Sequence, residues 1–236
     1  MMVVIVTACA VSATGQDATT EQYWGDFHAH FHINTVWEYY GDTGYRTVPG
    51  VWRMIYTRPS LRLHSWHRAL EGRCGLGLFY TYNDSTVNVL ELRPWLGTLI
   101  KWPRIKSLTI TSYFRLETRF LWDTDDWGRE QAMRFRYQLG TRIPLKRGNE
   151  FKYFYVPVAA EWFVDLTSSV DELFADKLRY YLGLGRIFGW DLVGEFYVIW
   201  QDTRTQEGQD FSTDSLILRF VFKRLWSTHD YMSQNS

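Results

Sequence analysis

Several features common in globular and membrane proteins are scarce in this chain of 236 residues. It has two cysteines, Cys9 and Cys74; we expect Cys9 to leave with an N-terminal leader, so no disulfide is expected in the mature chain. Beyond the first residues there is no run of about 20 apolar residues, which excludes a transmembrane helix. Charge is balanced, with 26 basic and 26 acidic residues, so we expect no nucleic-acid partner.

Motifs that carry common enzyme chemistry are also missing. The sequence has no nucleophile elbow, no glycine-rich phosphate loop and no paired Cys-x-x-Cys. No helical period of useful length, low-complexity stretch or domain boundary is found. We therefore expect a single domain that is not an enzyme and carries no cofactor.

The two ends of the chain differ from the part between them. Residues 1–15, MMVVIVTACAVSATG, are apolar and end in small residues, which is typical of a signal peptide, although its basic start is missing. Residues 227–236 are polar and are expected to form a flexible tail. The predicted domain is therefore 22–226.

Aromatic residues are abundant, at 18% of the chain, with 12 Trp and 15 Tyr. The stretch 107–145 shows how they are arranged, because it holds two segments in which apolar and polar residues alternate. A period of two predicts β-strands, since successive side chains point to opposite faces. One face of each segment is apolar throughout and the other carries arginines. That pattern is typical of a strand with lipid outside and a polar lumen inside.

The same alternation recurs along the whole domain and predicts about ten strands. We expect them at 23–39, 51–65, 70–82, 87–102, 108–120, 133–143, 151–164, 178–185, 190–201 and 215–226. Connectors alternate between short basic turns and longer acidic loops, and Trp and Tyr gather near both ends of the strands. Outer-membrane barrels have short periplasmic turns, longer external loops and two aromatic girdles. The fold class predicted is all-β: a single closed antiparallel transmembrane β-barrel.

Several segments resemble a known bacterial family. They are WEYYGDTGYRTVPGVWRMIYTRPSLRLH, GLGLFYTYN, LELRPWLGTLIKWP, RFRYQLGTRIPL and DKLRYYLGLGRIFG. The chain is similar in these to the domain of unknown function 2490, whose members are taken to be outer-membrane barrels. The resemblance implies fold and location, and it brings no catalytic residues with it.

Charged side chains on the polar face are the first candidate site, because the predicted register points them into the lumen. One interpretation is a plug of Arg–Glu pairs, since a barrel of this size is nearly filled by side chains. The other is a narrow pore for small anions, favoured by the excess of arginine. The predicted lumen residues are Arg93, Arg115, Glu117, Arg119, Arg134, Arg136, Arg142, Glu161, Arg179, Glu195 and Arg219.

A row of histidines is the second candidate. His28, His30 and His32 share one face of the first predicted strand, about 7 Å apart. Imidazoles suit Zn, Cu or Ni, although a chelate needs a further ligand from a neighbouring strand. A polar row facing the lumen is the simpler interpretation of the same pattern.

The sequence thus predicts an outer-membrane barrel, exported through the periplasm of a Gram-negative bacterium, that is structural or a narrow passive pore. Expected partners are outer-membrane lipid and lipopolysaccharide, the barrel-assembly machinery and a small anionic solute. Two alternatives stay open: an outer-membrane enzyme with a rim or lumen site, and a soluble barrel binding an apolar ligand. The soluble barrel would have the reverse arrangement, with its apolar face inside.

Overall fold

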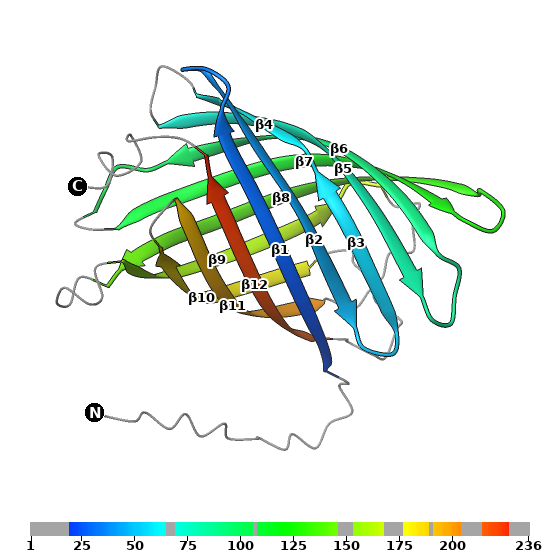
Figure 1. The fold of residues 1–236 in the computed structure, drawn as a ribbon. Helices are drawn as coiled ribbons and strands as arrows, with labels where there is room; N and C mark the ends of the chain where they lie inside the picture. Colours follow the sequence, from blue (N-terminus) through cyan, green and yellow to red (C-terminus); the bar gives the residue numbers. More distant parts are fainter. Residues whose placement is uncertain are drawn as a thin grey trace, which may run out of the picture.

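A computed structural model describes residues 19–64, 69–105, 108–145, 153–167, 177–188, 191–203 and 214–226. The predicted signal peptide and tail lie outside these residues. The described residues form twelve strands in one closed sheet, a β-barrel (Figure 1). The strands are β1 (Thr20–His32), β2 (Trp37–Val48), β3 (Trp52–Arg58), β4 (Ser60–His64), β5 (Leu70–Asn83), β6 (Val89–Lys101), β7 (Thr109–Asp123), β8 (Arg129–Pro144), β9 (Phe154–Asp165), β10 (Lys177–Ile187), β11 (Leu192–Thr203) and β12 (Ser215–Leu225). No helix among the described residues is long and apolar enough to cross a membrane.

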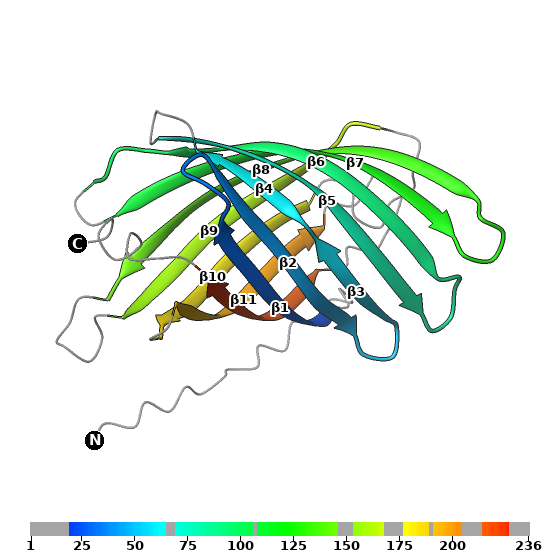
Figure 2. The same ribbon diagram turned by 45° about the horizontal axis from the view of Figure 1, so that its top comes forward.

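Strands β3 and β4 together fill one strand position in the barrel wall, and Pro59 separates them. We call each such position a stave. Both lie between β2 and β5, and the register does not change at the break: Asp42 faces Arg58 and Glu38 faces Arg62. Proline lacks the N–H that would continue the ladder, which explains the interruption. The described barrel therefore has eleven staves, steeply inclined to the barrel axis (Figure 2).

The closed all-β barrel is confirmed, and its extra stave is β2. The sequence around Gly41 and Gly44 predicted a turn, yet both glycines lie inside β2, which pairs with β1 along its length. The turn is earlier, at residues 33–36. Only glycine fits at position 44 beside the interior side chains, because a Cβ there would lie 2.5 Å from the Asp26 carboxylate and 2.7 Å from the Tyr56 ring. A glycine that makes room for lumen side chains thus resembled a turn signal.

The barrel closes through a parallel pair, β1 with β12, whereas every other neighbouring pair is antiparallel. Thr20 faces Ser215 at one limit of this pair and His30 faces Leu225 at the other. An odd number of staves has this consequence, since the first and last strands then run in the same direction. We call the two ends of the barrel the Thr20 end and the His32 end, after the bounds of β1.

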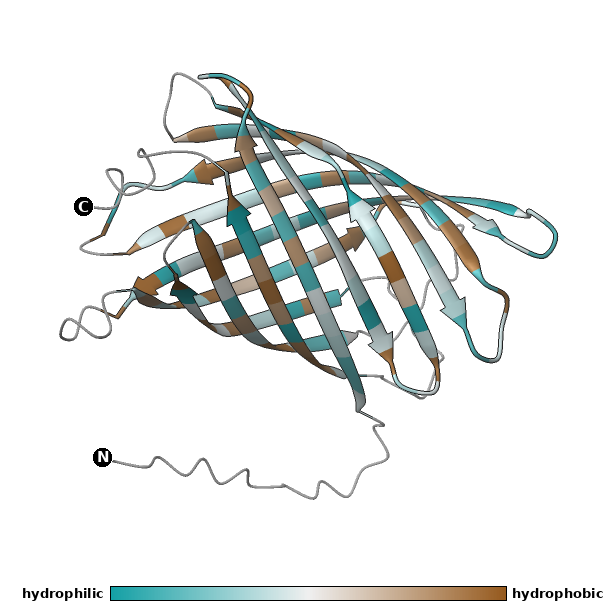
Figure 3. Ribbon diagram, viewed as in Figure 1, coloured by the Kyte–Doolittle hydropathy of each residue, from teal (hydrophilic) through white to brown (hydrophobic). Residues whose placement is uncertain are grey.

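The charged face of the sheet is inside and the apolar face is outside. Colouring by hydropathy shows the two kinds of residue alternating along the strands (Figure 3). Glu117 is fully buried, whereas Leu182 is 59% exposed and Leu96 61%. A bulge at Pro59 would divide residues 51–65 and turn Tyr56 outward, but the register is the same on both sides of Pro59, and Tyr56 and Ser60 are both buried.

Candidate functional site

The centre of the barrel interior is built around Glu117 on β7. Four arginines approach its carboxylate from three adjacent strands: Arg136 Nη1 at 2.7 Å, Arg134 Nη2 at 3.2 Å, and Arg93 and Arg115 at 3.3 Å each. The carboxylate is fully buried, so these contacts replace its hydration. Alternation places each of the four on the inward face of its strand.

Neighbouring carboxylates extend this network around the wall. Glu91 accepts hydrogen bonds from Arg119 Nε at 2.6 Å and Arg93 Nε at 2.7 Å. Glu161 accepts one from Arg136 Nε at 3.0 Å and one from the Tyr181 hydroxyl at 2.5 Å. The network is therefore continuous from β6 to β10, with arginines shared between carboxylates.

A second group lies at the seam where the barrel closes. Asp26 on β1 accepts hydrogen bonds from the Tyr56 hydroxyl at 2.6 Å and from Arg219 Nε at 2.5 Å. Tyr56 also lies 3.1 Å from Asp42, which Arg58 contacts at 3.0 Å. Side chains of β1, β2, β3 and β12 are thus tied together inside the seam.

Apolar and aromatic side chains form a third group in the described interior. Trp24, Tyr181, Ile199 and Ile217 form a buried cluster, and the two isoleucines have no exposed surface. The guanidinium of Arg179 lies 5.2 Å from the Trp24 ring, although β10 and β1 are three staves apart. Contacts therefore reach across the lumen as well as along its wall.

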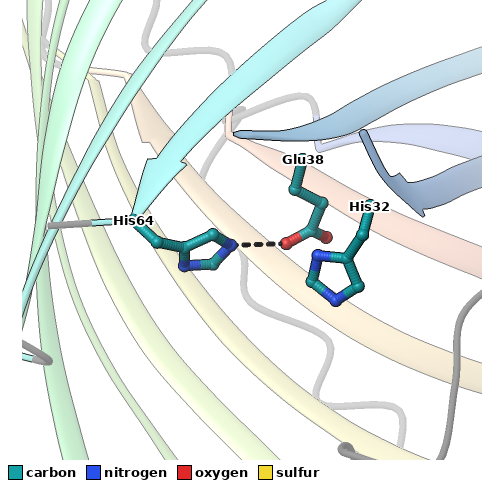
Figure 4. Close-up of side chains that lie close together, drawn as sticks. All are labelled: His32, Glu38 and His64. Atoms are coloured by element: carbon teal, nitrogen blue, oxygen red, sulfur yellow. Dashed lines mark hydrogen bonds and ion pairs between the residues drawn. The ribbon is translucent and has the colours of Figure 1, made fainter. Parts of the chain in front are cut away.

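At the His32 end, three possible metal ligands come together near the rim (Figure 4). The ligand atoms of His32, Glu38 and His64 all lie within 4.8 Å of one another. His64 Nε2 is 2.9 Å from Glu38 Oε2, the contact drawn as a dashed line in Figure 4. Among the described residues this is the one such group of three found.

Comparison with known families gives one result that bears on this geometry. The model of the family described as "Protein of unknown function (DUF2490)" matches residues 21–212. The chain belongs to the DUF2490 family. A comparison with curated proteins finds no match. Membership of DUF2490 assigns no site residues, so the side chains themselves must carry the functional argument.

The structure of this DUF2490 barrel places the predicted lumen residues on its inward face. Most are buried or half-buried in the network described above. Arg142 is exposed, and its guanidinium lies 5.5 Å from the ring of Tyr155 at the His32 end. Glu195 accepts hydrogen bonds from the hydroxyls of Tyr155 at 2.5 Å and Tyr197 at 2.8 Å.

The predicted histidine row is divided between two surroundings. His28 and His30 stack with ring centroids 6.3 Å apart, and Tyr40 packs edge-on against both. His32, at the end of the strand, lies with Glu38 and His64 instead. The sequence therefore placed the three histidines on one face but did not identify the neighbours of His32.

Residues on β2 were missed because that strand was not recognised. Glu38, Asp42 and Arg46 all point inward and contribute to the interior groups. A signal was present: in 37–48 the charged residues Glu38, Asp42 and Arg46 share one face, and Trp37, Tyr39 and Tyr45 share the other. The period of two therefore continues through both glycines.

Proposed function

We propose that this DUF2490 protein is an outer-membrane β-barrel whose lumen is closed by its own charged side chains, so that it acts as a structural barrel rather than a pore. One observation carries the proposal: the charged residues are buried inside while apolar residues form the exposed outer surface. A barrel in water would need the opposite arrangement, because large exposed apolar surfaces are not tolerated there.

The apolar surface supports a lipid environment on every side of the wall. Exposed large apolar residues occur on every stave except β7, whose Leu116 and Phe120 are half-buried. Examples are Phe27 on β1, Leu76 on β5, Leu139 on β8 and Phe220 on β12. A continuous band of this kind matches the lipid-facing surface of membrane barrels.

Aromatic residues support the same environment at both edges of the band. Tyr82, Trp162 and Trp200 are exposed toward the Thr20 end, and Trp102 and Trp226 toward the His32 end. Trp37 also lies at the His32 end, because it begins β2. Indole and phenol rings favour the boundary between hydrocarbon and water, so two such belts mark the two faces of a bilayer.

Packing of the interior supports closure. Phe79, Glu117 and Ile199 point inward and have 1% of their surface exposed or less. An open path for anions would leave arginines solvated, whereas Arg115 and Arg134 are buried against Glu117. Paired charges of this kind are tolerated in an interior because each satisfies the other.

In this proposal the barrel is exported through the periplasm and inserted by the barrel-assembly machinery. Lipid and lipopolysaccharide surround the wall, no small anion crosses it, and no reaction is catalysed. The odd number of staves departs from the even numbers of bacterial single-chain barrels, although a mitochondrial membrane barrel has nineteen.

Reconstitution tests the proposal. The purified protein should require detergent, change its gel mobility on boiling, and float with lipid vesicles. Once inserted in a planar bilayer, it should give no stepwise conductance, while a known porin in the same lipid does. A detergent-free monomer would overturn the membrane assignment, and regular conductance steps would overturn the closed lumen.

A further inference from the structure

We propose that His32, Glu38 and His64 form a binding site for a late first-row divalent cation, with Zn²⁺ as the reference ion, at the rim of the His32 end. Two imidazoles and a carboxylate are a ligand set that zinc accepts, with a fourth position left for water or another ligand. This site is independent of the closed lumen proposed above.

Local structure brings the three ligands together from three different strands. His32 and Glu38 face each other in the β1–β2 ladder, so their side chains start from adjacent positions on the inward face. The turn between them is held by Asn34, whose side-chain oxygen accepts hydrogen bonds from the N–H groups of Val36 and Trp37 at 2.9 and 2.8 Å. The N–H of His64 donates to the carbonyl of Val36 at 2.8 Å, which fixes the end of β4 against the same turn.

Distances within the group suit a single ion. Metal–ligand distances are about 2.1 Å, so ligand atoms of a tetrahedral site lie about 3.4 Å apart. The present separations are all within 4.8 Å, and His64 Nε2 to Glu38 Oε2 is 2.9 Å. Closing the site therefore requires a side-chain adjustment of about an ångström, which the exposed His32 at its strand end can make by rotating.

Glu38 is oriented by groups behind it, as the carboxylate ligands of metal sites usually are. Arg62 Nη1 lies 3.3 and 3.1 Å from its two oxygens, and His30 Nδ1 lies 3.3 Å from Oε1. Part of the Arg62 charge is balanced by Glu71, 3.5 Å from Arg62 Nε. The carboxylate is thereby held with Oε2 toward His64, while only 6% of Glu38 is exposed.

Access for an ion comes from the rim. His32 is exposed and the side chain of His64 is 31% exposed, so the site opens to solvent although Glu38 is buried. His28, in contrast, is 7% exposed and lies deeper along β1. The His28–His30–His32 row therefore does not make one site. Of these three histidines, only His32 belongs to the group at the rim.

Titration of the detergent-solubilised, tag-free full chain with Zn²⁺ tests the proposal, with Co²⁺ absorption as a second measurement. We expect one ion per chain and a Co²⁺ spectrum of a nitrogen- and oxygen-ligated site. His32→Ala, Glu38→Gln and His64→Ala should each weaken Zn²⁺ binding at least tenfold. His28→Ala is the matched control and should keep the wild-type affinity.

Heat-dependent gel mobility establishes that each variant is folded before it is titrated. Saturable binding lost in the three rim variants and kept in His28→Ala supports the site. Three results overturn it: no saturable binding by the wild type, unchanged binding in His64→Ala, or loss in His28→Ala as large as in His64→Ala. The wild-type Co²⁺ spectrum needs no variant, so a failure of one variant to fold does not remove the test.

Discussion

Glu117 shows how much depends on single charged residues in this interior. Its carboxylate is fully buried and faces four arginines, with Arg136 nearest at 2.7 Å. Removing one partner from a buried ionic group is far more costly than replacing the whole group, because the remaining charges stay buried without compensation.

We predict that Glu117→Gln, which preserves shape but removes the charge, destabilises the barrel by about 3–5 kcal/mol. Denaturant unfolding in detergent, followed by tryptophan fluorescence, would measure the loss. Glu130→Gln on the neighbouring strand is the matched control, since Glu130 is exposed and should change little. Equal midpoints for the two variants would contradict the role assigned to Glu117.

For single residues, the sequence predicts that these side chains point inward but does not predict which residues they contact. Alternation indicates that Arg93, Glu117 and Arg136 share the inner face, because that follows from strand geometry alone. The contact of Arg136 with both Glu117 and Glu161 depends on the stagger of β7, β8 and β9. Stagger depends on pairing between strands, which one sequence does not specify.

The sequence prediction failed at strand β2. Because β2 was not recognised, the predicted topology differed from the observed one. Counting Gly41 and Gly44 as a turn merged β1 with the start of β2 and gave an even number of strands. Each glycine instead makes room for an aromatic or charged neighbour; a Cβ on Gly41 would lie 2.3 Å from the Tyr39 hydroxyl. With β2 restored, β1 must close against β12 in parallel.

The parallel seam predicts a specific crosslink. Phe27 and Phe222 face each other across β1 and β12, and both are exposed on the outer wall. Neighbouring strands lie about 4.8 Å apart, within the Cα range of a disulfide. In a Cys9→Ser, Cys74→Ser background, Phe27→Cys with Phe222→Cys should therefore crosslink under mild oxidation, giving a faster-migrating band on a denaturing gel.

The control pairs Phe27→Cys with Leu218→Cys. Leu218 lies four residues from Phe222 along β12, a displacement of about 13 Å that no disulfide can span. Efficient crosslinking of this control, or none in the Phe222 pair, would show that β1 does not close the barrel in the described register.

For the whole molecule, the odd number of staves means that the domain begins at one end of the barrel and finishes at the opposite end. Both β1 and β12 begin at the Thr20 end. β12 finishes at the His32 end, where the N–H of Trp226 donates to the His30 carbonyl at 2.8 Å. The two longest connectors, 166–176 and 204–214, join strand ends that lie at the Thr20 end. The basic residues Arg104, Lys106, Lys146 and Arg147 belong to connectors that join strand ends at the His32 end. Because outer-membrane barrels expose their longer loops, the Thr20 end is assigned to the cell surface in the proposed membrane setting.

This orientation predicts that segments flanking the barrel lie on opposite sides of the outer membrane. An epitope inserted directly before Thr20 should bind antibody on intact cells, whereas one placed after Trp226 should bind only after the outer membrane is permeabilised. An epitope in connector 204–214 is the matched control and should behave like the first. Equal protection of both flanking epitopes would require an even number of crossings, and would contradict either β2 as a separate stave or the parallel pairing of β1 with β12.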